Sequence, residues 1–104
     1  MKTNELTGLA LDWAVAKCEG YRLDLAPEGS YAPSTDWSQG GPIIEREGIS
    51  VDRAGLAWTA DLSDSVGGYI EHTESGPTPL EAAMRCYVAS KLGDEVEIPR
   101  ELGL

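Results

Sequence analysis

Basic side chains are scarce in this 104-residue chain: eight Lys and Arg stand against eighteen Asp and Glu, which gives a formal net charge of −10. A nucleic-acid interface needs clustered Lys or Arg side chains to displace the counterions of the phosphates. Four of the arginines are instead isolated from one another in the sequence: Arg22, Arg46, Arg53 and Arg85. We therefore predict that the protein has no nucleic-acid partner.

Long hydrophobic runs are also missing, because the longest one falls far short of the roughly 20 residues that span a bilayer. No signal peptide is recognisable, and this favours the cytoplasm. The chain has only two cysteines, Cys18 and Cys86, one at or near the apolar side of each long predicted helix. We expect both to be buried free thiols, and a disulfide between the two helices is the alternative.

Signatures of catalysis and metal binding are lacking as well. The single histidine, His72, has acidic neighbours, and a carboxylate can orient a catalytic imidazole. Because no nucleophile motif and no second histidine accompanies it, we interpret it as a surface or hydrogen-bonded residue. Asp36, Glu45 and Glu47 could attract a divalent cation, but we interpret them as a solvated charge cluster. We predict no enzymatic activity, no cofactor and no metal site.

The chain does contain a fully specified helix near its C-terminus. Thr78 can cap this helix, Pro79 suits its first position, and Glu81 is placed to return a hydrogen bond to the cap. Gly93 is typical of a helix end. Apolar residues recur between these signals at one-face helical spacing: Leu80, Ala83, Met84, Tyr87, Val88 and Leu92. The helix is therefore expected to pack on an apolar partner.

Two further helices are predicted nearer the N-terminus. The first runs from about Glu5 to Glu19 and stops at Gly20, and its apolar face is formed by Leu11, Ala14, Val15 and Cys18. Trp13 lies off that face, either at the edge of the core or in an interface. The second is a short helix that Pro42 opens and Gly48 ends.

Three strands are predicted between the short helix and the last one, at Ile49–Asp52, Leu56–Leu62 and Tyr69–Thr73. The central strand alternates, with one apolar face formed by Leu56, Trp58, Ala60 and Leu62. The order of elements predicts an α+β two-layer sandwich in which an antiparallel meander packs against the C-terminal helix. We expect a single domain over residues 1–104, with residues 94–104 as a loosely docked tail.

The segment between Tyr31 and Arg46 is the best candidate for a ligand site. It is predicted to be mostly a loop, with aromatic surfaces, hydrogen-bonding groups and one guanidinium, supplied by Tyr31, Trp37, Ser38, Gln39 and Arg46. The alternative is a structural loop that folds Trp37 under the sheet to complete the core. An exposed Trp37 would favour binding, and a buried Trp37 would favour the structural role.

Three blocks of the sequence are similar to one protein family. They are Leu6-Thr-Gly8 with Ala14-Val-Ala16, Trp37 with Gly41-Pro-Ile-Ile-Glu45, and Pro79-Leu80 with Ala82-Ala-Met84. The middle block is the most specific, and over about residues 6–92 the chain resembles the NinX-like proteins of temperate phages and prophages. The resemblance implies an accessory protein that works in the host bacterial cytoplasm, and it implies neither an activity nor particular site residues.

Two binding functions are consistent with these features. The favoured hypothesis is a non-catalytic module that modulates a host process through a protein partner, because an acidic surface can steer onto basic patches of host proteins. The alternative is sequestration of a small nucleotide-like host signal by the segment from Tyr31 to Arg46, with a homo-oligomer interface as one place for it. An enzyme is the third and least favoured hypothesis, because the sequence does not place a nucleophile, a base and an orienting group together.

Overall fold

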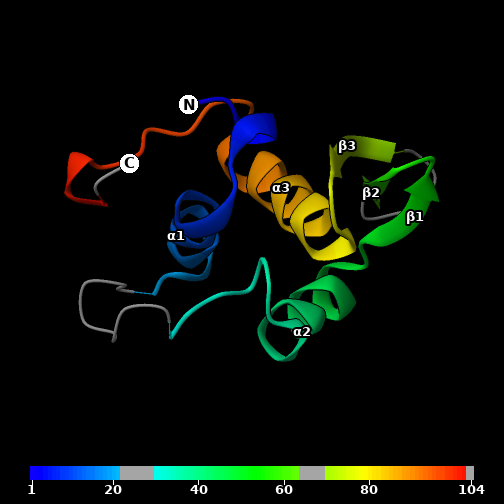
Figure 1. Cartoon of the computed structure of the whole chain (residues 1–104), viewed down its shortest axis with the longest axis horizontal. Helices are drawn as coiled ribbons and strands as arrows, with labels where there is room; N and C mark the ends of the chain where they lie inside the picture. Colours follow the sequence, from blue (N-terminus) through cyan, green and yellow to red (C-terminus); the bar gives the residue numbers. More distant parts are fainter. Residues whose placement is uncertain (22–29, 64–69, 103–104) are drawn as a thin grey trace.

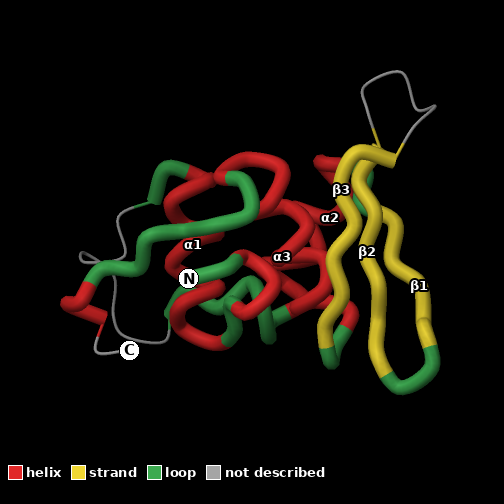
Figure 2. Tube along the Cα trace, turned by 90° about the horizontal axis from the view of Figure 1, so that it is seen from above, coloured by secondary structure: helices red, strands yellow, loops and turns green. Residues whose placement is uncertain are grey.

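The computed structural model describes residues 1–21, 30–63 and 70–102 of the chain, and it has the predicted α+β architecture (Figure 1). Its main elements are α1 (Gly8–Glu19), α2 (Trp37–Glu47), β1 (Ser50–Ala54), β2 (Ala57–Ser63), β3 (Ile70–Gly76) and α3 (Pro79–Leu92). The sheet lies on one side of α3, while α1 and α2 contact α3 from other directions (Figures 1 and 2). Helix α3 is thus the centre of the core.

The ends of α3 confirm the predicted capping. Thr78 accepts a hydrogen bond from the backbone N–H of Glu81 at 3.1 Å, and the N–H of Gly93 bonds to Ala89 at 3.0 Å. The returning bond expected from the Glu81 side chain is not the one observed, because this carboxylate accepts from the Thr7 hydroxyl of the neighbouring segment at 3.4 Å. The contact links the start of α3 to the start of α1.

The burial of α3 extends beyond the single face that was predicted. Five of the six expected residues are buried and Leu92 is partly buried, while Ala82, Cys86 and Ala89 are buried as well. The reason is that the sheet, α1 and α2 each pack against a different side of the helix. Both cysteines are free; Cys86 is buried, as expected, and Cys18 is partly exposed.

Helix α1 begins later than predicted. Glu5 ends a short 3-10 turn, η1 (Thr3–Glu5), and Leu6 and Thr7 are extended, so the helix starts at Gly8. Its C-terminal signal is confirmed, because Gly20 has φ +79°, a left-handed conformation that glycine adopts without strain. The expected face is buried at Leu11, Ala14 and Val15, and Trp13 packs, partly buried, at the edge of the core.

Helix α2 is longer than the predicted short helix, because it begins at Trp37 and not at Pro42. The Asp36 side chain caps it by accepting the backbone N–H of Ser38 at 2.9 Å. Pro42 therefore lies inside the helix, where its fixed φ is compatible with helical geometry although its missing N–H removes one backbone bond. The predicted end is confirmed by Gly48, which has φ +69°.

The three strands form the predicted antiparallel meander in the order β1-β2-β3. On β2, Ala60 is buried, and Trp58 and Leu62 pack, partly buried, against the core. The assignment of Leu56 to this face was wrong, because Leu56 lies in the turn between β1 and β2 and is 95% exposed. The predicted start of the third strand at Tyr69 lies outside the described residues.

The N-terminus pairs with part of the predicted tail. The Met1 ammonium donates to the Val96 carbonyl at 2.9 Å, and the Val96 N–H donates to the Met1 carbonyl at 2.8 Å. Thr3 adds a backbone bond to Asp94 at 2.8 Å, and Val96 is buried. Residues 94–96 are therefore held in place beside the N-terminal segment (Figure 1).

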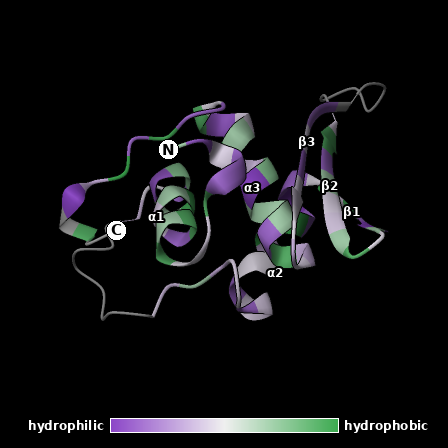
Figure 3. Cartoon of the chain, turned by 45° about the horizontal axis from the view of Figure 1, so that its top comes forward, coloured by the Kyte–Doolittle hydropathy of each residue, from purple (hydrophilic) through white to green (hydrophobic). Residues whose placement is uncertain are grey.

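Among the described helices, none is both long enough and apolar enough to cross a membrane. Figure 3 shows hydrophilic residues interspersed with hydrophobic ones along α1 and α3. Most of the buried hydrophobic residues form one cluster, to which α1, α2, the sheet and α3 all contribute.

Candidate functional site

The predicted ligand segment is mostly helical, and several of its polar groups form the N-terminal cap of α2. Asp36 Oδ1 accepts from both the backbone N–H and the hydroxyl of Ser38, at 2.9 and 2.7 Å. These bonds, the side-chain bond first, lower the pKa of Asp36. The side chain of Ser38 is thus engaged within the protein, although it remains exposed.

Gln39 joins this cap to the turn that precedes it. Its side-chain oxygen accepts from the backbone N–H of Ala32 at 2.9 Å, and its side-chain nitrogen donates to Asp36 at 3.1 Å and to the Ser30 carbonyl at 3.2 Å. Both the donor and the acceptor ends of this amide are therefore used internally. The arrangement fixes the path of residues 30–36 against the first turn of α2.

Trp37 is the member of the predicted set that presents an apolar surface to solvent, with 56% of its surface exposed. It occupies the first position of α2, directly after the cap. The prediction that Trp37 folds under the sheet is therefore wrong, and the exposed position is the one that favours binding. At 100° per residue, nine residues separate Trp37 and Arg46 by about half a turn, so they lie on opposite sides of α2.

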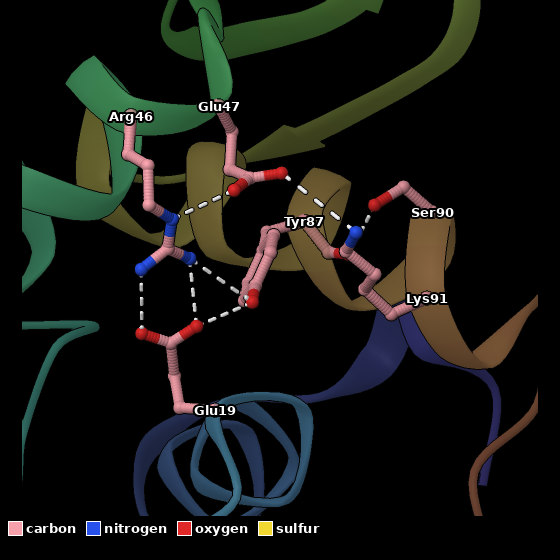
Figure 4. A network of polar contacts seen from close by, with 6 residues as sticks. All are labelled: Glu19, Arg46, Glu47, Tyr87, Ser90 and Lys91. Atoms are coloured by element: carbon pink, nitrogen blue, oxygen red, sulfur yellow. Dashed lines mark hydrogen bonds and ion pairs between the residues drawn. The ribbon is translucent and has the colours of Figure 1, made fainter.

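Arg46 belongs to a polar network that joins the three helices (Figure 4). Its two terminal nitrogens donate to the Glu19 carboxylate at 2.9 and 2.7 Å, and its Nε donates to Glu47 at 2.8 Å. The Tyr87 hydroxyl also donates to Glu19, and the Arg46 guanidinium lies 5.7 Å from the centre of the Tyr87 ring. Glu47 in turn approaches Lys91 at 3.9 Å.

The network shifts the pKa values of its members in the directions expected for a stable ion pair. Hydrogen bonds from Arg46 are the main reason that the pKa of Glu19 is lowered, and the bond from Tyr87 adds to the effect. The same contacts raise the pKa of Arg46, while burial is the main reason that the pKa of Tyr87 is raised. Glu19 and Arg46 are therefore both charged, and paired with each other, near neutral pH.

Tyr31 packs partly buried against the core, and its ring meets that of Tyr21 edge to face at 5.3 Å between centres. Its hydroxyl is buried and has no hydrogen-bond partner among the described residues. Burial raises the pKa of Tyr31, and the charge of Glu19 adds to this. Tyr31 and Arg46 thus both lie near Glu19, whereas Ser38 and Gln39 meet at Asp36.

One buried carboxyl, Asp12 on α1, was not among the residues predicted from the sequence. Asp12 is 6% exposed, and its Oδ1 accepts from the backbone N–H of Ser34 at 2.9 Å. Burial is the main reason that its pKa is raised, and the contacts with Ser34 oppose the rise. A polar residue beside Leu11 on a buried helix face was the available signal, and its role is to anchor the turn of residues 32–36 to α1.

A surface pocket of about 290 Å³ lies where the N-terminus, β3 and the segment after α3 meet. It is lined by Lys2, Thr3, Asn4, Glu74, Asp94 and Glu95. Burial, followed by the charge of Asp94, raises the pKa of Glu74. Three carboxylates and one ammonium make the pocket acidic, so it suits a cationic group better than an anionic nucleotide.

The other candidates for catalysis and metal binding lie at α1, α2, β3 and α3. Asp36 and Glu47 lie at opposite ends of α2, and the described residues hold no group of three or more His, Cys, Asp or Glu placed to bind a metal ion. His72 is partly buried on β3, and its carbonyl faces the Cys86 thiol at 3.5 Å. Burial is the main reason that the pKa values of Cys18 and Cys86 are raised, to about 11 and about 12.

A family model described as Bacteriophage P22, NinX matches residues 2–91 of the chain. The matched region runs from η1 to the last turn of α3 and includes α1, α2 and the sheet. No match was found among the curated proteins.

Proposed function

Because the chain belongs to the NinX family of bacteriophage P22, we propose that it is a phage accessory protein that works as a non-catalytic binding module on a protein partner in the host cytoplasm. One observation carries the proposal. The polar side chains that could bind a small ligand, Ser38, Gln39 and Arg46, form hydrogen bonds within the protein, whereas several large apolar side chains are exposed. The exposed ones among the described residues are Met1, Leu9, Tyr21, Trp37 and Leu56. Aromatic and apolar side chains that reach solvent are typical anchors of protein interfaces.

The charge of the chain supports a basic partner. Its net charge of −10 speeds association with a positively charged surface by long-range attraction and opposes association with another acidic protein. The raised thiol pKa values support a non-catalytic role, because protonated thiols are poor nucleophiles near neutral pH.

The proposal is tested by gentle purification of the tagged protein from bacterial lysate, with native and denatured masses compared. The expected result is a stoichiometric host protein that is released by raised salt, because the attraction between exposed charges is screened. A wild-type protein that brings down no partner at low salt would contradict the proposal.

The comparison of native and denatured masses also tests the second non-catalytic function, sequestration of a small nucleotide-like signal. That function predicts a discrete small adduct, lost on denaturation and absent from a folded Trp37→Ala variant. Trp37→Ala is a cleaner test than Arg46→Ala, because Arg46 also joins the three helices. Turnover of a host metabolite, measured on the purified protein, would instead establish an enzyme.

A further inference from the structure

Leu56 stands out among the exposed apolar residues because of both its exposure and its position. It is 95% exposed, whereas Met1, Leu9, Tyr21 and Trp37 range from 38% to 58%. A single exposed leucine is common on protein surfaces, so exposure alone does not mark a site. The surroundings of Leu56 supply the further arguments.

The turn that carries Leu56 does not need an apolar side chain. Gly55 and Leu56 are the two residues between the paired Ala54 and Ala57, and Gly55 has φ +65°. In such two-residue turns glycine supplies the positive φ, and the residue that follows is most often Asn, Asp or Ser. Leu56 contributes nothing to the core, and it stands where the turn favours Asn, Asp or Ser. Residues that depart from such local sequence preferences are expected at functional sites.

The turn is also held in a defined conformation. Arg53 Nε donates to the Gly55 carbonyl at 3.1 Å, and the guanidinium lies 5.7 Å from the centre of the Trp58 ring. Arg53 and Trp58 are paired across the two strands, and Trp58 packs against the core. Because the backbone of the turn is already ordered, burial of Leu56 by a partner costs less backbone entropy than it would in a flexible loop.

The composition of the hairpin end matches that of an interface anchor. Arg and Trp are enriched among the residues that dominate binding energy whereas leucine is not, so the neighbours of Leu56, Arg53 and Trp58, give the hairpin end this composition. In Figure 2 the β1–β2 turn lies at the free end of the hairpin, away from α1 and α3. We propose that the β1–β2 turn inserts Leu56 into an apolar pocket on a basic host protein, flanked by Arg53 and Trp58.

The charge of the chain identifies the class of partner. A second copy carries the same net charge of −10, so two copies repel each other, whereas a basic surface is attracted. The attraction comes from the chain as a whole, because the register places Asp52 and Asp61 on the face of the sheet opposite Ala60, Arg53 and Trp58. The inference rests on the proposed function and names the surface that serves it.

The test compares three C-terminally tagged proteins in bacterial lysate: wild type, Leu56→Asn, and Leu56→Met as a control that keeps an apolar side chain of similar volume at the turn. Asn suits the turn position, so Leu56→Asn is expected to fold as well as the wild type, and urea unfolding checks this. Captured proteins are identified by mass spectrometry, and the salt-released one is purified and titrated against each variant. We expect a basic protein whose affinity falls about 10-fold or more for Leu56→Asn and much less for Leu56→Met.

The possible failures are distinguishable. If a stoichiometric partner binds wild type and folded Leu56→Asn equally, the inference is wrong and the proposed function stands. If wild type captures no stoichiometric partner, both fail. A wild-type protein that forms a dimer in light scattering, and loses it on Leu56→Asn, would assign the turn to self-association and overturn the inference.

Discussion

Gly40 packs so closely against its neighbours that it has no room for a side chain. A Cβ atom there would lie 2.4 Å from the Pro33 carbonyl oxygen and 2.6 Å from Leu80 Cδ2. We expect Gly40→Ala to lower the free energy of unfolding by about 2 kcal/mol, because the backbone of the turn must move. At Gly41 the nearest atom beyond its chain neighbours and the helix backbone is a Trp37 ring carbon at 3.9 Å. The gain in helix propensity is opposed by contact of the new Cβ with the Pro42 ring that follows, so Gly41→Ala should change the free energy of unfolding by less than about 1 kcal/mol.

Urea unfolding of the two alanine variants measures this difference directly. They share the same helix and the same chemical change, so helix propensity is matched between them. Equal losses of stability would contradict the steric argument at Gly40.

Tyr31 and Tyr87, which both pack in the core, allow a second comparison of two variants with the same chemical change. Tyr87→Phe removes a hydroxyl that donates to the Glu19 carboxylate, whereas Tyr31→Phe removes a buried hydroxyl without a partner among the described residues. We expect a loss of about 2 kcal/mol for Tyr87→Phe, and little change or a small gain for Tyr31→Phe. Thermal and urea unfolding measure both, and a larger loss at Tyr31 would show that its hydroxyl has a partner.

Among the elements, α3 was predictable because its signals are local. Thr78, Pro79 and Gly93 specify the two ends within the chain itself, and these ends are observed. Helix α2 was predicted too short because Gly40, Gly41 and Pro42 are typical of loops. The cap at Asp36 was available as a signal, and the close packing of Gly40 shows why a glycine is retained inside this helix.

The candidate site was less predictable than the fold. The residues chosen from the sequence were neighbours in the chain, but a helix turns Trp37 and Arg46 to opposite sides. The contact of Arg46 with Glu19 and Tyr87 joins positions that are 27 and 41 residues from it. No local pattern encodes such a meeting, because it depends on how three helices pack.

The link between the three helices is expected to weaken in acid. The folded-state pKa of Glu19 is lowered, so its contribution is present above the ordinary pKa of about 4.3 and is lost as the pH falls through the folded value. We predict that wild type is more stable than Glu19→Gln at about pH 7 and that the gap narrows towards about pH 3. Urea unfolding of both proteins across this range measures the gap, and a constant difference would exclude the ionised carboxylate as its source.

For the whole molecule, the excess of eighteen acidic over eight basic residues predicts that salt stabilises the fold. Raising NaCl from about 10 mM to about 150 mM shortens the screening length from about 30 Å to about 8 Å, which weakens repulsion among the carboxylates. The thermal midpoint measured by circular dichroism should therefore rise. A falling midpoint would mean that paired charges, such as Arg46 with Glu19, outweigh the repulsion.

The central position of α3 has a consequence for how the protein is made. Translation proceeds from the N-terminus, and α1, α2 and the strands all leave the ribosome before the helix against which they pack. The backbone bonds between Met1 and Val96 form later still. The apolar faces of the earlier segments are thus expected to stay uncovered until α3 has been made, and a nascent chain interrupted before Pro79 would leave those faces open to chaperones and proteases.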